Sequence, residues 1–515
     1  MFKALATVSS LTLVSRMTGL VRDTMTLRLF GASAATDAFV FAFTLPNLLR
    51  RLFAEGAFSQ AFVPILGEIR TRQGDEAARE LIDNVAIVLA AALALVTLAG
   101  VVAAPIIVMV AAPGFAADPQ QTALASSMLR IMFPYLGFIS LVALAGGVLN
   151  TWSRFAIPAI TPVLLNISMI VAMWLGAGWF DPPELSLAVG VLAGGVAQLA
   201  LQVPALLRAG VFPRVRHGLR AAWHHPGVRR VLNQMGPAVL GVSVAQVSLV
   251  INRVFQSFLE SGSMTWLYSA DRLMEFPTAL LGVALGTVLT PALSRASACG
   301  DKQAYGALLD WGLRLACVLA LPAAIGMAVL SVPLVATLFH HGRFDAQDVM
   351  MSARAVSAYS AGLLGLILIK ILAPGFYANR DIRTPVRIGV ATLVLTQCLN
   401  LMLIGPFKHV GLALSISIAA TVNAALLFTI LRRRGIYLPQ PGWRSFALRL
   451  APALAVLAVA LWIGQAQFDW IALGAGPWWQ RVGALALVGG IGVGLYFVAL
   501  LMLGFRVGDF RHRPV

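Results

Sequence analysis

The chain has 515 residues, of which 59% are hydrophobic and only 11% are charged, and its formal net charge is +17. Soluble globular proteins contain about 25% charged residues, so this composition excludes a soluble protein and indicates a polytopic membrane protein. Apolar runs continue from residue 5 to residue 505 with short interruptions, which leaves no room for a soluble domain of ordinary size. In such a protein the basic excess reports membrane topology rather than nucleic-acid binding.

Apolar runs long enough to cross about 30 Å of hydrocarbon predict fourteen transmembrane helices. The first seven are expected near residues 5–30, 37–66, 82–111, 122–149, 156–179, 184–207 and 230–259. The other seven are expected near residues 264–293, 304–337, 348–374, 386–404, 410–431, 445–465 and 481–505. We therefore predict an all-α polytopic membrane fold.

The basic residues of the predicted loops lie almost entirely on one side of the membrane. Loops on that side contain 22 Lys and Arg residues, whereas loops on the opposite side contain only Arg343 and Lys408. Cytoplasmic loops carry an excess of Lys and Arg in membrane proteins. The pattern therefore predicts that both termini are cytoplasmic.

A long basic loop between Arg208 and Arg230 separates the predicted helices into two groups. Its Arg, His and Pro content suits a cytoplasmic linker, part of which can lie at the membrane interface. AFVPIL ends the first helix pair of one half and VLTPAL ends that of the other, and both related repeats and chance similarity stay open as explanations. We predict an N-lobe at 1–208, a linker at 209–229, a C-lobe at 230–434 and a C-terminal helix pair at 435–515.

Five arginines lie inside the predicted membrane helices. An ionised arginine at bilayer depth costs a few kcal/mol, so it faces protein, water or an anionic ligand. Ion pairs between helices that only fix packing are the alternative for each residue taken singly. The five residues are Arg16, Arg22, Arg50, Arg51 and Arg272. Together they predict that the protein binds an anion within the membrane.

Polar residues near these arginines extend the candidate site. Arg50 follows Asp37 by thirteen residues, or roughly 20 Å along a helix, so its side chain cannot reach the interface. Asn47 and Arg51 are four residues apart and share a helix face, and Arg272 and Glu275 are three apart and can pair.

Other arginines are expected to have roles outside the site. Arg28, Arg253 and Arg354 fall near predicted helix ends and are expected to snorkel to the interface. Arg130 and Arg314 lie farther from the ends of their predicted helices, and we expect them to have packing roles.

The sequence contains no signature of catalysis or of a metal site. It has no GxxxxGK[ST] motif for nucleotide phosphates, no HExxH motif and no cysteine pairs at zinc spacing. We therefore do not expect ATP hydrolysis, and we assign no catalytic residue, no metal and no cofactor.

Several long motifs resemble one known family. They are SRMTGLVRD, TDAFVFAFTLPNLLRRLFAEGAFSQAFVPIL, LNTWSRFAIPAITPVLLNIS, YSADRLMEFP and LAPGFYANRDIRTPV. Together they look like the MurJ family, also called MviN, of the multidrug/oligosaccharidyl-lipid/polysaccharide exporter superfamily. The likeness runs nearly end to end.

The resemblance implies a fold, an activity and a location. Members of the family move lipid II, the undecaprenyl-diphosphate-linked peptidoglycan precursor, from the inner to the outer leaflet of the bacterial cytoplasmic membrane. The fold implied is two pseudo-symmetric lobes of six helices, followed by a helix pair that forms a groove for the polyprenyl tail. Lipid II and membrane lipids are the expected partners, the cell-wall synthesis machinery is a candidate partner, and nucleic acid is not expected.

The resemblance also assigns residues. Arg16, Arg22, Arg50 and Arg272 match the family's essential cavity arginines, and Asp37, Asn47 and Glu275 match its other sensitive polar positions; Arg51 is added on chemistry alone. Some members bind sodium in the second lobe, but here only Asp310 and Asn400 are suggestive, so no sodium site is assigned. The membrane potential or an ion gradient is the expected energy source.

Three alternatives to a flippase stay open at this stage. A cation-coupled drug exporter of the same superfamily would share the fold, but its cavity would favour carboxylates or aromatic residues. A polyprenyl-phosphate glycosyltransferase would also use arginines for the diphosphate, but it would need catalytic carboxylates at the membrane surface. A structural partner of a cell-wall complex is the third alternative.

Overall fold

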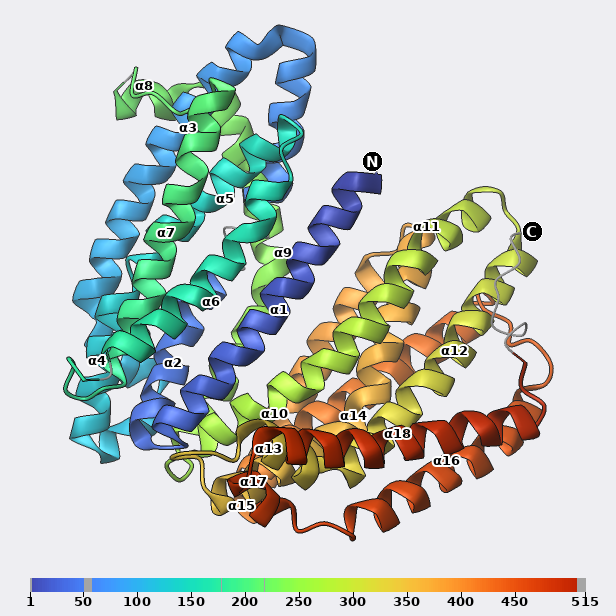
Figure 1. The fold of residues 1–515 in the computed structure, drawn as a ribbon. Coiled ribbons are helices and arrows are strands. Elements are labelled where there is room, and N and C mark those ends of the chain that lie inside the picture. The colour runs from blue at the N-terminus through green and yellow to red at the C-terminus, as the bar shows by residue number, and fades with distance from the viewer. Residues whose placement is uncertain (1, 51–57, 177, 217, 507–515) are drawn as a thin grey trace. The chain divides into compact units, whose positions relative to one another are not determined.

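The computed structural model describes residues 2–50, 58–176, 178–216 and 218–506, and almost all of them are helical (Figure 1). No strand occurs within those ranges, so the predicted all-α class is confirmed. The chain forms two compact units, Met1–Met264 and Thr265–Val515. The lobe and linker boundaries given by the sequence stay a prediction.

The first unit is a bundle of helices, several of which pack against helices that are not their neighbours in the chain. Its elements are α1 (Phe2–Phe30), α2 (Ala34–Leu49), α3 (Phe58–Ala111), α4 (Pro119–Met132), α5 (Tyr135–Thr151), α6 (Ala156–Gly176), α7 (Leu185–Ala209), α8 (Leu219–His224) and α9 (Pro226–Ser257). Within it α1 packs along α6, α6 along α7, and α3 along α5 and α9.

Two breaks divide what would otherwise be very long helices of this unit. α3 changes direction at Gly74, whose φ of 91° lies in the region that glycine adopts without a steric penalty. α4 and α5 are separated by a turn at Phe133 and Pro134, because proline lacks the N–H that a continuous helix needs. The single helix predicted at 122–149 is therefore two helices.

The core of the first unit lies between α3, α5, α7 and α9. Phe62, Leu66 and Leu81 of α3 are fully buried against residues such as Leu149 of α5 and Leu206 of α7. Apolar residues on the outer face of α3 are instead exposed, namely Leu95, Val102, Ile106 and Met109. An exposed apolar helix face of this kind fits a hydrocarbon environment rather than water.

The second unit has a similar all-helical build. Its elements are α10 (Ser263–Pro277), which begins just before the unit does, α11 (Ala284–Ala298), α12 (Lys302–Val329), α13 (Ser331–Phe339), α14 (Ala346–Ala378), α15 (Arg383–Arg433), α16 (Trp443–Gln465), α17 (Trp470–Ala475) and α18 (Trp478–Met502). α14 packs against α11, α12 and α15 and forms the centre of this unit.

α15 contains a break where the sequence predicts a loop between two membrane helices. Lys408 has a φ of 49° and a ψ of −129°, which is not helical. Because a lysine rarely adopts positive φ, the surrounding turn must hold it there. The break confirms that residues 383–433 form two helical segments rather than one.

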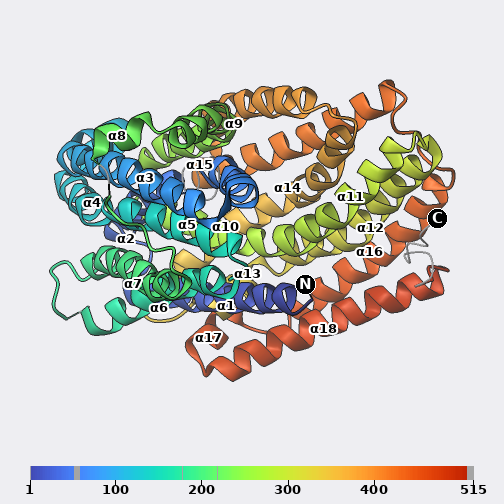
Figure 2. The same ribbon diagram turned by 90° about the horizontal axis from the view of Figure 1, so that it is seen from above.

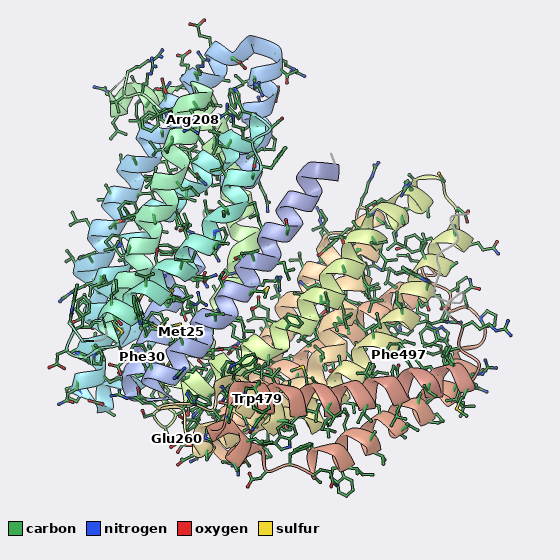
Figure 3. The ribbon with its side chains drawn as sticks, viewed as in Figure 1. Met25, Phe30, Arg208, Glu260, Trp479 and Phe497 are labelled. Atoms are coloured by element: carbon green, nitrogen blue, oxygen red, sulfur yellow. The ribbon has the colours of Figure 1, made fainter. Side chains whose placement is uncertain are left out.

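α16 and α18 lie side by side in both views (Figures 1 and 2). Gly492 of α18 permits this approach, since a Cβ at that position would lie 2.4 Å from a methyl carbon of Leu461. The Tyr496 hydroxyl donates to the Val318 carbonyl of α12 at 2.7 Å, which holds the pair against the unit. Trp479 and Phe497 lie toward opposite ends of α18 (Figure 3), and both are exposed.

The described helices overlap each of the fourteen predicted membrane spans, and residues 51–57 of the span predicted at 37–66 lie outside the described residues. Among the described residues, ten helical stretches are long and apolar enough to cross a membrane. A multi-pass helical membrane protein is therefore confirmed, and the number of crossings stays a prediction.

Candidate functional site

Arg22 is buried inside the first unit, where α1 packs along α6. Its Nε and Nη2 donate to Oδ1 of Asp23 at 3.0 and 2.6 Å, and its Nη1 donates to Oδ1 of Asn166 at 2.9 Å. The Arg22 side chain is only 7% exposed and that of Asp23 only 6%. The positive charge of Arg22 is thus paired within the protein, as a buried charge must be.

Asn166 of α6 also belongs to this site, although the sequence did not predict it. Its Nδ2 donates to the Ser15 carbonyl at 3.0 Å and to the Thr18 hydroxyl at 3.2 Å, while its Oδ1 accepts from Arg22. One side chain therefore joins α6 to two turns of α1. An asparagine in the apolar run PVLLNIS was the available signal, because buried amides in membrane helices usually bond to a neighbouring helix.

Arg16 lies on α1 but in a different environment from Arg22. It is exposed, and within the described residues its side chain makes no hydrogen bond or ion pair. Leu13, Met17 and Leu20 on the same helix are also exposed, whereas Phe30 at its end is buried (Figure 3). The guanidinium of Arg16 therefore projects from an apolar helix surface and can bind a ligand without breaking an internal pair.

Asp37 lies in the first turn of α2 and is buried. Its Oδ2 accepts a hydrogen bond from the Gly262 backbone N–H at 2.7 Å. A carboxylate in the first turn also interacts favourably with the helix dipole. Asp37 thus fixes the start of α2 to the segment that follows α9.

Asn47 and Arg50 form a pair at the other end of α2. The Nε and Nη2 of Arg50 donate to Oδ1 of Asn47 at 3.0 and 2.8 Å, and both residues are half-buried. α2 ends at Leu49. Arg51, the fifth arginine of the predicted site, lies outside the described residues.

Arg272 of α10 is the site arginine of the second unit, and its predicted pair with Glu275 is present. Nη1 of Arg272 donates to Oε2 of Glu275 at 3.1 Å, and Nη2 donates to the Tyr268 hydroxyl at 3.1 Å. The guanidinium carbon lies 5.0 Å from the centre of the Tyr268 ring. The Arg272 side chain is 34% exposed and that of Glu275 is 55% exposed, so this pair remains accessible.

The helix that carries Arg272 is irregular directly after the pair. α10 ends at Pro277 and a π-helical turn, Thr278–Val283, leads into α11. Single π-helical turns occur frequently at functional sites because they reposition side chains. A Cβ added to Gly282 would lie 3.2 Å from Cγ of Lys370, so the stem of that exposed lysine lies beside the turn. The sequence alone offered no signal for this neighbour.

Asp310 of α12 is bonded to several protein donors. Its Oδ1 accepts from the Tyr437 hydroxyl at 2.7 Å, the Gln440 backbone N–H at 3.1 Å and the Trp443 ring N–H at 2.7 Å. Nε of Arg314 lies 2.8 Å from its Oδ2. These bonds fix the loop before α16, which gives Arg314 the packing role expected of it.

Asn400, the other residue considered for sodium, donates from its Nδ2 to Oε1 of Gln397 at 3.2 Å. Within the described ranges, no group of three or more His, Cys, Asp or Glu side chains is placed to hold a metal ion.

Acidic residues of α3 pair with the basic segment after α7. Glu68 bonds to Arg230 at 2.6 Å, and this hydrogen bond holds the pKa of Glu68 below its usual range, with a smaller contribution from Arg72. Asp83 accepts from the Arg214 backbone N–H at 2.8 Å and lies 3.3 Å from Nε of Arg216. The basic segment is thus held on the end of the first unit.

Comparison with known proteins places the chain in a family. The family model described as Lipid II flippase MurJ matches residues 27–474. The Lipid II flippase MurJ of Burkholderia cenocepacia is 49% identical over 513 residues, covering 100% of this chain and 99% of its own. The chain belongs to the lipid II flippase MurJ family. The Probable lipid II flippase MurJ of Vibrio cholerae is 41% identical, covering 98% of this chain and 96% of its own.

Solved structures agree with this family at the level of the fold. A structure titled Lipid II flippase MurJ, inward closed conformation, matches with a TM-score of 0.76 at 22% identity, covering 96% of this chain and 99% of its own. An inward-facing multidrug resistance MATE family transporter of the MOP superfamily matches with a TM-score of 0.65 at 14% identity, covering 84% and 98%. This chain therefore shares its helical fold with both structures.

Proposed function

We propose that this protein is a lipid II flippase, which moves the undecaprenyl-diphosphate-linked peptidoglycan precursor from the inner to the outer leaflet of the bacterial cytoplasmic membrane by alternating access. Membership of the MurJ family supports this activity directly. A flippase moves its substrate without making or breaking a covalent bond, so the protein is a transporter and not an enzyme.

The accessible arginines are the observation that carries the proposal. A guanidinium pairs with phosphate oxygens through a planar set of donors and never loses its proton, so it can replace the hydration that a diphosphate loses in the membrane. Arg16 is exposed, and Arg50 and Arg272 are only half-buried. These three residues can therefore contact a headgroup within their own units.

Release of the headgroup requires that the arginines exchange their phosphate contacts for contacts within the protein. An exposed ion pair three residues apart on a helix stabilises by only about 0.2–0.5 kcal/mol. Glu275 can therefore give up Arg272 to a phosphate when the substrate arrives, and can take it back when the substrate leaves. In this mechanism Glu275 lowers the affinity of Arg272 for the substrate, and Tyr268 keeps the guanidinium in place.

The membrane potential is a sufficient energy source for this step. An anion that moves outward from a negative cytoplasm gains about 2.3 kcal/mol per charge per 100 mV. We expect headgroup export in energised cells to fall when the potential is collapsed at a constant pH gradient. Unchanged export would leave an ion gradient as the energy source.

The membrane orientation and the partners also belong to this proposal. The excess of Lys and Arg in one set of loops supports cytoplasmic positions for both termini. Lipid II and membrane lipids are the partners that the proposed activity requires, and the cell-wall synthesis machinery is a candidate partner. The alternative function, drug export, is supported only by the fold that the chain shares with a MATE transporter.

The decisive experiment measures lipid II headgroup on the outer face of cells that are depleted of their native flippase. Such cells are rescued with the wild-type protein or with Arg272→Ala at matched expression. Export that is restored by the wild type and lost in the variant is the expected result. Export that does not depend on this protein would refute the proposal and leave it an accessory role.

A further inference from the structure

The segment between α7 and α9 is folded onto a single level of α3. The Arg214 backbone N–H donates to Asp83 at 2.8 Å, and Nε of Arg216 lies 3.3 Å from the same carboxylate. Farther along the segment, Nε2 of His225 lies 3.8 Å from Glu80. Because Asp83 and Glu80 lie within one turn of each other, these contacts fix the segment, with α8 in it, to one place on the first unit.

Buried apolar residues anchor the same segment. Val211, Ala222 and Val228 belong to the core of the first unit, together with Ala78 and Leu81 of α3. α8 packs against α3 and α9, and Ala222 is its buried residue. The other five residues of α8 are exposed. The short helix is therefore held through one side, and the rest of its surface is open.

Large apolar side chains lie on this open surface. Leu219 and Trp223 are four residues apart, so they share one face of α8, and both are exposed. Phe212 and Val215, which precede α8, are exposed as well. A group of exposed apolar side chains marks a surface that contacts a protein or a membrane. Packing inside the first unit does not account for these four residues.

Arginines alternate with the apolar residues along the segment. Within the described residues, four of these arginines have exposed side chains that make no hydrogen bond or ion pair, namely Arg208, Arg214, Arg220 and Arg229. The carboxylates of Glu68 and Asp83 pair instead with Arg230 and Arg216. Four guanidinium groups are therefore available to an anion outside the protein.

The ends of two predicted membrane spans place this surface at a membrane interface. α7 is long and apolar enough to cross a membrane, and Leu201 and Leu207 on it are exposed up to the residue before Arg208. The span predicted at 82–111 begins beside Asp83, which the segment contacts. Arg208 lies at the same end of the first unit as α8 (Figures 1 and 3). The exposed apolar face of α7 thus leads directly to the arginines.

Acidic lipid fits this combination of side chains. Tryptophan is enriched where a protein crosses the membrane interface, and basic segments next to a membrane helix are attracted to acidic headgroups. A segment that carries both groups lies in the interface with its apolar residues among the acyl chains. The rule that cytoplasmic loops are basic explains the arginines alone, and it does not explain the exposed Leu219 and Trp223.

We propose that α8 and the residues on either side of it form a binding surface for the acidic headgroups of membrane phospholipids. The arginines contact the phosphates, and Leu219 and Trp223 insert between the lipids. This surface lies outside the candidate functional site, and the inference does not depend on the proposed flippase function. It assigns a lipid preference to a segment that otherwise only connects two helices.

The test measures which lipid lies beside α8 in a bilayer. A bimane fluorophore is attached at Ala221→Cys in the full-length protein, whose native cysteines are replaced by serine. The protein is placed in bilayers of phosphatidylcholine with increasing fractions of phosphatidylglycerol, and brominated chains on either lipid quench the fluorophore on contact. The wild type is expected to favour phosphatidylglycerol at least about fivefold at low salt, because each basic residue near an acidic surface contributes about fivefold, and less at high salt.

Substitutions of the arginines test the source of the preference. Arg214→Gln combined with Arg220→Gln is expected to lower the preference at least about fivefold. The corresponding double substitution by lysine keeps both charges and is expected to change it by less than about twofold. Unfolding temperatures should stay the same, because these side chains make no bond within the described residues.

Two more variants serve as controls. Arg432→Gln combined with Arg433→Gln removes the same charge from exposed residues at the end of α15, in the second unit, and should leave the preference at α8 unchanged. Trp223→Ala is expected to weaken quenching by both lipids alike, because it removes an inserted side chain but no charge.

Three outcomes would overturn the inference. Equal quenching by the two lipids in the wild type would refute a preference for acidic headgroups. Weak quenching by both would show that α8 faces water, which would leave its apolar face to a protein partner. A preference that survives the glutamine substitutions would place the acidic lipid on other residues. None of these results bears on headgroup export, so the proposed function is tested separately.

Discussion

Arg22 in the first unit and Arg272 in the second have the same side chain and opposite surroundings. The Arg22 side chain is 7% exposed and bonds to Asp23 and Asn166 inside the packing of α1 and α6. The Arg272 side chain is 34% exposed and pairs with the still more exposed Glu275. An arginine in an apolar sequence can thus hold helices together or bind a ligand, and burial together with the partner decides which role is larger.

The physical difference is the cost of losing the partner. Removing one member of a buried ion pair leaves a charge without compensation and costs about 3–5 kcal/mol, whereas an exposed pair contributes about 0.2–1 kcal/mol. Arg22 should therefore affect stability strongly, and Arg272 should affect binding with little effect on stability.

Arg22→Ala is expected to lower the free energy of unfolding by about 3 kcal/mol, because it leaves the Asp23 carboxylate buried without its partner. Chemical unfolding of the purified protein in detergent measures the change. Arg16→Ala is the control, since Arg16 is an exposed arginine on the same helix, and its expected change is under about 0.5 kcal/mol. Equal effects of the two substitutions would contradict the assigned difference.

Asp310→Ala extends the comparison to a buried charge of the second unit. Asp310 accepts from Tyr437 and Trp443 and pairs with Arg314, and hydrogen bonds to a charged group contribute about 1.5–3 kcal/mol each. We expect the free energy of unfolding to fall by about 2–3 kcal/mol. The same unfolding measurement on Tyr437→Phe should show a smaller loss, and a loss as large as that of Asp310→Ala would argue against the carboxylate as the centre of the cluster.

Arg272→Ala tests the accessible side of the comparison. We expect a change in the free energy of unfolding below about 1 kcal/mol, because the pair with Glu275 is exposed. We also expect binding of a polyprenyl diphosphate to weaken at least tenfold, which corresponds to about 1.4 kcal/mol. Arg354→Ala, which changes an exposed arginine of the same unit, should alter neither quantity. A large loss of stability in Arg272→Ala would place it with Arg22 instead.

The smallest effect is expected at Asp381, in the segment between α14 and α15. Hydrogen bonds from Thr384, together with Arg434, lower the pKa of Asp381 to about 2. Because the folded pKa is depressed, the stabilisation is fully present above about pH 4 and is lost as the pH falls toward 2. The unfolding temperature of Asp381→Asn should therefore lie slightly below that of the wild type at pH 7 and converge with it near pH 2. A constant difference across this range would contradict the shifted pKa.

The sequence alone was sufficient for the class of fold and for part of the site. Apolar runs of membrane length located the helices, because hydrocarbon forces every backbone group to bond within its own segment. The break at Lys408 and the pair of Arg272 with Glu275 also follow from the sequence, since both depend only on residues close together in the chain.

Only the tertiary structure decided what each buried arginine does. The bond from Arg22 to Asn166 joins residues 144 positions apart, and that from Arg253 to Thr44 joins residues 209 apart. Hydropathy and helical spacing describe one helix at a time and carry no information about which neighbour a polar side chain meets. The partners that distinguish a packing arginine from a binding arginine come from other helices, and the packing of those helices determines which role is available.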